Sequence, residues 1–268
     1  MKFCSVNGIE TNTIAINDRA LAYGDGTFTT AKVVNGLVIF LSEHVKRLMQ
    51  TCQTLDIKPP SEQDLVRQIK VAAQGNELAV LKVIITAGQG GRGYSRKGLS
   101  NNATSVIISI SAFPLHYKKQ AVEGITLGNS QQLLSVSPML AGLKHLNRLE
   151  QVLIKTELEQ RCEDELVIAN YLGQVIEASS SNIFYFFADK LYTPDLSLSG
   201  VDGIMRQLIL FHNPQITIYP TSFSDLSKAN SIFICNSLMG IIPVKAYNER
   251  LLDLTPVFAI KAKMKGLF

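Results

Sequence analysis

Turn signals and apolar patterns in the N-terminal part of the chain limit the fold more than any other feature. Asn7-Gly8 and Asn35-Gly36 are typical of two-residue hairpins, in which both turn residues take a positive φ. Each pair is flanked by segments rich in β-branched residues, so we expect antiparallel strands around both turns. Two helices are expected next, one capped by Ser42 and one that opens at Ser61 with capping-box spacing. Strands over 79–86 and 104–113 follow, which predicts a mixed α and β unit.

The segment between these last two strands contains a glycine motif. Gly88, Gly90 and Gly93 satisfy GxGxxG, the spacing of a dinucleotide-binding turn. The residues that follow, YSRKGLSNN, have no helical pattern whose N-terminus could receive a pyrophosphate. We therefore reject a dinucleotide site and predict a flexible loop, with Arg92 and Lys97 among its cations.

A single lysine, Lys144, lies just ahead of an amphipathic segment in LAGLKHLNRLEQ, residues 140–151. Leu146, Leu149 and Leu153 recur at helical spacing, which predicts a helix whose apolar face packs on a core. The residues before Lys144 favour a turn, so the lysine is expected where a loop feeds a helix. Taken alone, this pattern is more typical of a solvent-exposed lysine, so a functional role needs support from other parts of the chain.

The length of the chain favours two domains. At 268 residues it exceeds one ordinary domain and fits two domains of roughly 100 to 150 residues each. A polar segment over 116–124 separates two parts that are both rich in strand patterns. We predict a smaller N-terminal α/β domain over 1–117, a linker over 118–125 and a larger C-terminal domain over 126–268.

Charge and cysteine content exclude several classes of function. The net charge is +4 and the basic residues form no long run, so nucleic-acid binding is not expected. The four cysteines lie far apart without a CxxC pair, which indicates reduced thiols and no metal site. No apolar run reaches the ~20 residues that span a membrane, and the N-terminus lacks the apolar segment of a signal peptide. We expect a cytoplasmic protein without a membrane partner.

Seven motifs occur in order over nearly the whole chain and together suggest a family. Any one of them could arise by chance, but the ordered set is specific. It resembles the fold type IV pyridoxal-phosphate enzymes, the group of branched-chain and D-amino-acid aminotransferases and aminodeoxychorismate lyases. The motifs are YGDGTFTTAKV, HVKRL, GGRGYS, AGLKHLNRLEQVLI, VIEASSSNIF, GVDGIMRQ and ICNSLMGIIPV.

The resemblance implies a fold, a cofactor and a partner. The fold is a mixed α+β and α/β architecture of two domains, like that of D-amino-acid aminotransferases, with pyridoxal 5′-phosphate between the domains. Lys144 is similar to the lysine that holds this cofactor covalently and moves protons. A homodimer is also implied.

The resemblance further implies which residues surround the cofactor. Glu177 matches the carboxylate that pairs with the pyridine nitrogen, and a protonated ring nitrogen makes the cofactor an electron sink. Arg47 matches the arginine that binds the phosphate. The remaining cofactor residues implied by the motifs are Ser181, Asn182, Gly203, Ile204, Asn236 and Ser237.

Two departures separate the chain from its aminotransferase relatives. Where D-amino-acid aminotransferases have a tyrosine and a glutamate, this sequence has Phe28 and Thr29, and the Glu-Gly of branched-chain enzymes is replaced by Thr29-Thr30. The resemblance is therefore closest to the lyases and implies that Thr30 assists proton transfer and Thr29 contacts the substrate. Threonine is also simply a good strand residue, so a structural role for Thr30 stays open.

The activity implied is conversion of 4-amino-4-deoxychorismate to 4-aminobenzoate and pyruvate. This small substrate is a dianion, and Arg92 is the expected carboxylate partner because its planar guanidinium can bind both oxygens. Lys97 is a second candidate. An aminotransferase for D- or branched-chain amino acids is the alternative enzyme, and a binding protein that lost its chemistry is the alternative without catalysis.

Overall fold

The computed structural model describes residues 2–99 and 104–266, and these form two compact units. Unit 1 extends to Phe113 and also includes Lys144–Asn147. Unit 2 comprises Pro114–Leu143 and the chain from Arg148 onward. Within the described residues, no helix is long and apolar enough to cross a membrane.

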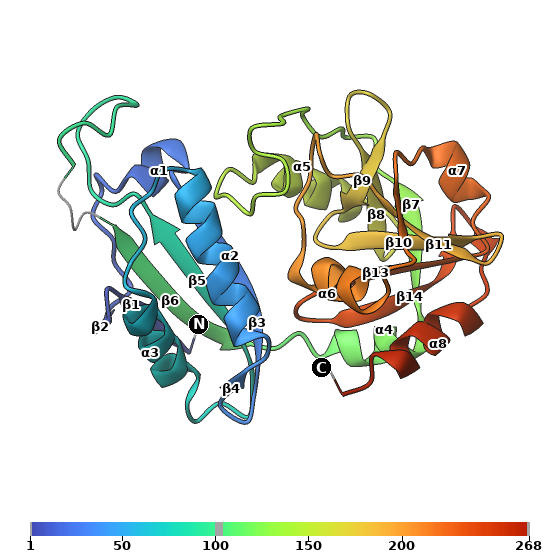
Figure 1. Cartoon of the computed structure of the whole chain (residues 1–268), viewed down its shortest axis with the longest axis horizontal. Helices are drawn as coiled ribbons and strands as arrows, with labels where there is room; N and C mark the ends of the chain where they lie inside the picture. Colours follow the sequence, from blue (N-terminus) through green and yellow to red (C-terminus); the bar gives the residue numbers. More distant parts are fainter. Residues whose placement is uncertain (1, 100–103, 267–268) are drawn as a thin grey trace. The chain divides into compact units, whose positions relative to one another are not determined.

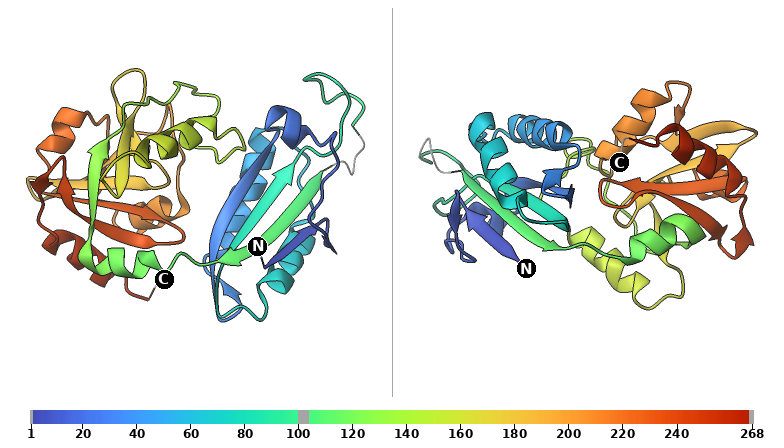
Figure 2. Two further views of the ribbon diagram at one scale, coloured as in Figure 1. Left: turned by 180° about the vertical axis from the view of Figure 1, so that it is seen from behind. Right: turned by 90° about the horizontal axis from the view of Figure 1, so that it is seen from below.

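Unit 1 is an antiparallel sheet with helices α2 and α3 on one face (Figure 1). In the view from behind, the strands lie in front of these helices (Figure 2, left). The described strands are arranged in the order β2-β1-β6-β5-β3-β4. The elements are β1 (Phe3–Val6), β2 (Ile9–Glu10), α1 (Arg19–Tyr23), β3 (Gly26–Val34), β4 (Leu37–Val38), α2 (Leu41–Thr54), α3 (Glu62–Ala73), β5 (Leu78–Thr86) and β6 (Ser105–Ala112).

Local turn chemistry accounts for most of these boundaries. The Asn7-Gly8 turn has φ of 51° and 81°, and the Asn35-Gly36 turn has φ of 49° and 75°, so both predicted hairpins are confirmed. Ser61 caps α3 as predicted, since its hydroxyl accepts the Asp64 N–H. The prediction that Ser42 caps α2 is wrong. The N-cap is Phe40, two residues earlier and in a left-handed conformation, and the Ser42 hydroxyl donates to Glu43 instead.

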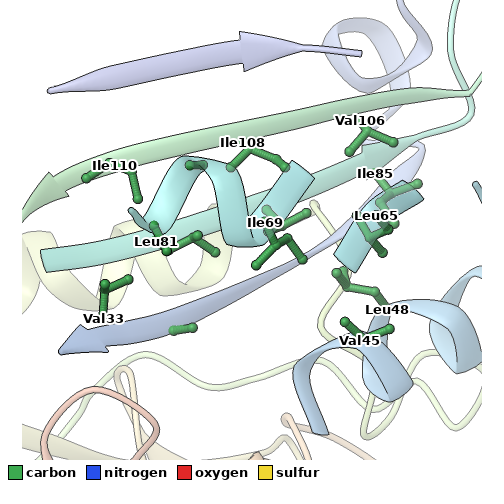
Figure 3. Close-up of a cluster of buried hydrophobic side chains, with 14 of the residues drawn as sticks. Val33, Val45, Leu48, Leu65, Ile69, Leu81, Ile85, Val106, Ile108 and Ile110 are labelled. Carbon is green, nitrogen blue, oxygen red and sulfur yellow. The ribbon is translucent and has the colours of Figure 1, made fainter. Parts of the chain in front are cut away.

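A single apolar layer joins the sheet of unit 1 to its helices (Figure 3). Strand residues such as Leu81 and Ile108 pack against helix residues such as Leu48, Leu65 and Ile69, all at most 1% exposed. Complete burial of such side chains stabilises the fold by about 1.5–3 kcal/mol each. Because side chains alternate along a strand, the other face of β3 and β5 carries a separate set of residues.

Unit 2 is built on a mixed sheet of nine strands in its described residues. The order is β12-β11-β10-β13-β14-β7-β8-β9, and β15 pairs with β14. Its strands are β7 (Ile125–Asn129), β8 (Glu165–Ala169), β9 (Val175–Ala178), β10 (Asn182–Phe187), β11 (Lys190–Pro194), β12 (Thr217–Tyr219), β13 (Ser231–Asn236), β14 (Gly240–Tyr247) and β15 (Arg250–Leu251). Its helices are α4 (His116–Glu123), α5 (Leu149–Leu158), α6 (Ile204–His212), α7 (Phe223–Ser227) and α8 (Thr255–Lys263).

The boundary between the units differs from the predicted linker over 118–125. The division lies between Phe113 and Pro114, and most of the predicted linker forms helix α4 of unit 2. None of the residues of α4 is fully buried. The sequence of α4 is polar and has few apolar positions at helical spacing. For this reason the sequence predicts a linker there and not a helix.

The segment after Lys144 also differs from the prediction. Helix α5 begins only at Leu149, so Lys144 does not lead directly into it. Leu149 and Leu153 are 70% and 52% exposed, and Ile154 is the residue of α5 that is buried. The predicted apolar face is therefore wrong. Ahead of α5, His145 forms an antiparallel bridge with Thr27 of β3, and the helix begins only after this segment.

Candidate functional site

Lys144 is held by backbone pairing to strand β3. The Phe28 N–H donates to the Lys144 carbonyl at 3.0 Å, and the Thr27 hydroxyl donates to the same oxygen at 3.0 Å. The Leu146 N–H donates to the Gly26 carbonyl at 3.0 Å. A Cβ on Gly26 would lie 2.4 Å from a carbonyl oxygen of β5 and 2.7 Å from Leu146. Glycine at this position therefore allows the lysine segment to approach β3.

The side chain of Lys144 lies over an aromatic ring on the sheet face opposite α2. Its Nζ is 4.6 Å from the centroid of the Phe28 ring. The Nζ of Lys82 on β5 lies 4.9 Å from the same centroid, and Lys82 is the cross-strand partner of Thr30. Each cation–π contact contributes about 0.5–1 kcal/mol at an exposed site. Thr30 follows Phe28 by two positions and therefore lies on the same face of β3, and the structure adds Lys82, which no sequence pattern singled out.

Thr29 lies on the other face of β3, next to helix α2. Its side chain is fully buried, and its hydroxyl oxygen is 2.6 Å from Nδ1 of His44. This differs from the expected substrate contact, because alternation along β3 turns Thr29 toward the helices and Thr30 away from them. Arg47 is half-buried on the same helix as His44, one turn further on.

Burial lowers the pKa of His44 from 6.5 to about 3, and the charges of Arg47 and Lys144 add to this effect. The imidazole is therefore neutral at physiological pH. Its Nε2 is buried and has no hydrogen-bond partner among the described residues, which is uncommon for a buried polar atom. His44 lies off the apolar stripe of α2, so the sequence pattern did not predict its burial.

Glu177 lies buried on β9 in unit 2, with 4% of its surface exposed. Its Oε2 accepts the Val201 N–H at 2.9 Å. Burial lowers the pKa of the Arg148 guanidinium, and the charges of Glu177 and Glu150 oppose this shift. Arg148 also donates to the Leu143 carbonyl at 2.8 Å and so joins the two ends of the segment that carries Lys144.

Asn182 holds the entry to helix α6. Its Nδ2 donates to the Val201 carbonyl at 2.8 Å, and its Oδ1 accepts the Gly203 N–H at 3.1 Å. A Cβ on Gly203 would lie 2.2 Å from this Oδ1, so glycine is required for the close approach. No side chain of residues 2–99 or 104–266 caps α6, so the N–H groups of its first turn, starting at Ile204, are suited to an anion.

Two serine hydroxyls lie near Glu177 and Asn182 in the sequence. The Oγ atoms of Ser179 and Ser181 are both buried without a hydrogen-bond partner in the described structure. Ser181 was expected from the motif, whereas Ser179 was not. Buried hydroxyls are usually hydrogen-bonded, so both are available to a polar group of a ligand.

The side chain of Asn236 serves the turn between β13 and β14. Its Oδ1 accepts the N–H groups of Leu238 and Met239, each at 2.9 Å. Its Nδ2 donates to the Ser180 carbonyl at 3.2 Å. Asn236 therefore shapes the loop that presents Ser237, which differs from the expected role as a side-chain donor to phosphate.

The predicted flexible loop is instead fixed by an ion-pair network. Arg19, 3% exposed, donates to Asp25 and to the carbonyls of Gly93 and Tyr94. Arg96 pairs with the other oxygen of Asp25. Burial alone would raise the pKa of Asp25, but hydrogen bonds from the two arginines and their charges lower it below 3.8.

The two arginines of this network are therefore structural, which leaves other cations of the loop to meet a ligand. Arg92 and Lys97 are both exposed on the loop that the network holds. Neither residue belongs to the ion pairs of Asp25.

The donor set fits pyridoxal phosphate. The cofactor needs an amine for its aldehyde, a carboxylate for its ring nitrogen and donors for its phosphate. Unit 1 contains an amine, Lys144, and a guanidinium, Arg47, and unit 2 contains the buried carboxylate of Glu177 and the first turn of α6 at Ile204. Ser179 and Ser181 add buried hydroxyls that lack partners.

Comparisons with known proteins agree with this assignment. The family model of amino-transferase class IV matches residues 26–247. An aminodeoxychorismate lyase of Vibrio harveyi is 34% identical over 267 residues, which cover 97% of either chain. The crystal structure of 4-amino-4-deoxychorismate lyase from Pseudomonas aeruginosa has a TM-score of 0.90 and 32% identity, over 99% of this chain and 100% of that one.

Aminotransferases of the same family are more distant. A D-alanine aminotransferase of Listeria monocytogenes is 27% identical over 251 residues, which cover 88% of this chain and 82% of the relative. The resemblance inferred from the motifs is thus confirmed, together with the mixed α/β fold and the pyridoxal-phosphate cofactor that it implies. The chain belongs to the amino-transferase class IV family.

Proposed function

We propose that this protein is a pyridoxal-phosphate-dependent lyase that converts 4-amino-4-deoxychorismate to 4-aminobenzoate and pyruvate. The observation that carries the proposal is 34% identity to an aminodeoxychorismate lyase over 97% of both chains. The aminotransferase of Listeria shares 27% over a shorter part of each chain. Phe28 and Thr30 support the same choice, because both positions depart from the aminotransferase pattern.

In this proposal Lys144 anchors the cofactor, Glu177 pairs with its ring nitrogen, and Arg47 binds its phosphate with the first turn of α6. The Ile204 N–H and the loop of Ser237 complete the phosphate site. Asn182 and Gly203 set the start of α6, and Asn236 orients Ser237. When bound, the cofactor withdraws electrons from the substrate carbon that carries the amino group and makes its proton acidic.

The chain itself supplies the proton transfers. The Lys144 amine takes the proton from C4 of the substrate, and the electrons of the C–H bond form a ring double bond as the neighbouring C–O bond breaks. The enolpyruvyl group leaves with the oxygen and takes up one proton to become pyruvate, so the reaction needs no oxidant. Aromatisation of the ring makes the step irreversible. Thr30 lies on the sheet face of Phe28 and Lys144, where a hydroxyl can assist the lysine.

The substrate carboxylates require cations near Lys144. Lys82 is suited to one of them, because its ammonium shares the Phe28 ring with that of Lys144. Arg92 and Lys97, on the fixed loop over 87–99, remain candidates for the other carboxylate. Replacing Arg92 by alanine is expected to raise KM while the cofactor content stays unchanged.

The proposal is tested by two incubations of the purified holoenzyme. With 4-amino-4-deoxychorismate we expect 4-aminobenzoate and pyruvate in equal amounts, and Lys144→Ala should abolish both products. With D-alanine or branched-chain amino acids and 2-oxoglutarate, we expect little glutamate. Strong glutamate formation without pyruvate would identify an aminotransferase instead. A colourless protein that binds no pyridoxal phosphate would identify an inactive binding protein.

We also propose that the enzyme is a homodimer, as the family resemblance implies. Light scattering coupled to size-exclusion chromatography should give twice the mass of the chain at micromolar concentration. The mass of a single chain at that concentration would contradict this part of the proposal and leave the activity untouched.

A further inference from the structure

His44 is a buried side chain that the mechanism above does not use. It lies in the first turns of α2, with 1% of its surface exposed, and one side of its ring is held by the Thr29 hydroxyl at 2.6 Å. The opposite nitrogen, Nε2, is buried and has no partner in the described structure. A buried polar atom without a partner costs about 1–3 kcal/mol, so its retention needs a reason.

The surroundings of His44 indicate which ring nitrogen carries the proton. Arg47 and Lys144 lie close enough for their charges to depress the pKa of the imidazole. An Nε2 with a free lone pair would accept a hydrogen bond from one of these cations, yet it accepts none. An Nε2 that carries hydrogen is repelled by both cations and stays without a partner until an anion arrives. Nδ1 then accepts the hydrogen of the Thr29 hydroxyl.

We propose that the Nε2–H group of His44 is a further donor to the cofactor phosphate, beside Arg47, and that Thr29 fixes the tautomer that makes it a donor. His44 and Arg47 are three residues apart on α2 and therefore neighbours on the helix surface. His44 is thus a cofactor-binding residue and Thr29 a positioning residue. This inference rests on the proposed function, because it takes Arg47 as the phosphate arginine.

The test compares pyridoxal phosphate with pyridoxal, which lacks the phosphate. Dissociation constants are measured by equilibrium dialysis for the wild type, His44→Leu and His44→Gln. Hydrogen bonds to charged groups contribute about 1.5–3 kcal/mol, so His44→Leu should raise the dissociation constant of pyridoxal phosphate roughly 10- to 100-fold. Its binding of pyridoxal should stay within about twofold of wild type. His44→Gln, which keeps an amide N–H near the position of Nε2, should recover most of the loss.

Further variants separate a contact with phosphate from a structural role. Thr29→Val should weaken the binding of pyridoxal phosphate but not that of pyridoxal, and Thr29→Ser should leave both unchanged. Nitrogen-15 NMR should show hydrogen on Nε2 of the cofactor-free protein and a changed Nε2 shift once the phosphate form binds. If His44→Leu does not fold, His44→Asn replaces it, because the shorter asparagine places its amide near the position of Nδ1. The His44→Asn protein should then bind pyridoxal phosphate less tightly than the His44→Gln protein.

An equal loss of affinity for pyridoxal and for pyridoxal phosphate in the His44 variants would overturn the inference. A ring that carries hydrogen on Nδ1 alone would also overturn it. Either result would leave the proposed lyase intact. Failure of the wild type to bind pyridoxal phosphate would instead overturn the proposed function, and this inference with it.

Discussion

At the scale of single residues, burial decides the protonation state of the polar groups in this protein. His44 is ordinary in sequence, yet its burial beside two cations brings its pKa to about 3. Burial likewise raises the pKa of the Cys52 thiol to about 12, so this cysteine is unreactive at neutral pH. Lys144, the proposed cofactor lysine, is by contrast only half-buried.

The low pKa of His44 predicts a pH-dependent stability. Between pH 6.5 and about 3 the unfolded chain binds a proton at this histidine that the folded chain does not bind. The contribution to the free energy of unfolding therefore falls as the pH falls through this window, by at most about 1.4 kcal/mol per pH unit. Urea unfolding at several pH values should show a steeper loss for wild type than for His44→Gln. Parallel curves would contradict the burial of a neutral imidazole.

Lys82 provides a second prediction at this scale. Lys82→Met removes the ammonium near the Phe28 ring but keeps an apolar side chain of similar length. KM for 4-amino-4-deoxychorismate should rise roughly 10-fold or more, as expected when a charge-assisted hydrogen bond is lost. Lys32→Met is the matched control, because Lys32 on β3 lies on the same face of the sheet as Lys82. Its Nζ is 5.6 Å from the centroid of a different ring, that of Phe113. Equal effects of both variants would remove Lys82 from the substrate site.

At the scale of elements, one buried carboxylate sets the conformation of a long loop. Asp25 receives hydrogen bonds from Arg19 and Arg96, and Arg19 also donates to carbonyls of the loop. Arg96 further donates to the Asp56 carbonyl at 2.9 Å, which ties the loop to the end of α2. Because these bonds satisfy buried charges, the loop over 87–99 has a defined shape without regular secondary structure.

Asp25→Asn tests this network. The change leaves Arg19 buried without its charged partner, so the free energy of unfolding should fall by about 3 kcal/mol. Trypsin should also cleave faster after Arg92 and Lys97. Asp64→Asn is the control, since Asp64 pairs with Arg67 at the surface and should change stability by less than about 1 kcal/mol. A loop that resists trypsin equally in both variants would show that the network does not hold it.

At the scale of the whole molecule, the chain divides its proposed cofactor residues between two units, each with its own core. Lys144, Arg47 and Thr30 belong to unit 1, whereas Glu177 and the start of α6 belong to unit 2. The segment Lys144–Asn147 belongs to unit 1 although its neighbours on both sides belong to unit 2. Arg148 donates a hydrogen bond to the Leu143 carbonyl and so connects the residues on either side of this segment.

Removal of the cofactor is therefore expected to lower the stability of the whole protein. A ligand at about 100 times its dissociation constant adds about 2.7 kcal/mol to the free energy of unfolding. For a chain of this size, Tm should fall by roughly 5–10 °C in the cofactor-free protein. Lys144→Ala, which cannot form the covalent link, should show a smaller difference between the two forms. An identical Tm with and without pyridoxal phosphate would contradict a cofactor site in the native protein.

The sequence by itself determined the elements and the family. Asn-Gly turns, the cap at Ser61 and the strand patterns of β5 and β6 depend on residues close together in the chain, so local rules predicted them. The ordered motifs predicted the family and its cofactor, and the comparisons confirmed both. The site residues named from the motifs remain predictions for the experiments above.

The tertiary structure alone decided which polar groups pair and which faces are buried. The segment from Lys144 to Leu146 bonds to the backbone of β3, and α5 begins only at Leu149. Likewise, only packing buries Thr29 against His44 and gives Arg96 to Asp25. These contacts join residues far apart in the chain, and their energies depend on burial. Periodicity and turn chemistry carry no information about either, so the sequence could not predict these contacts.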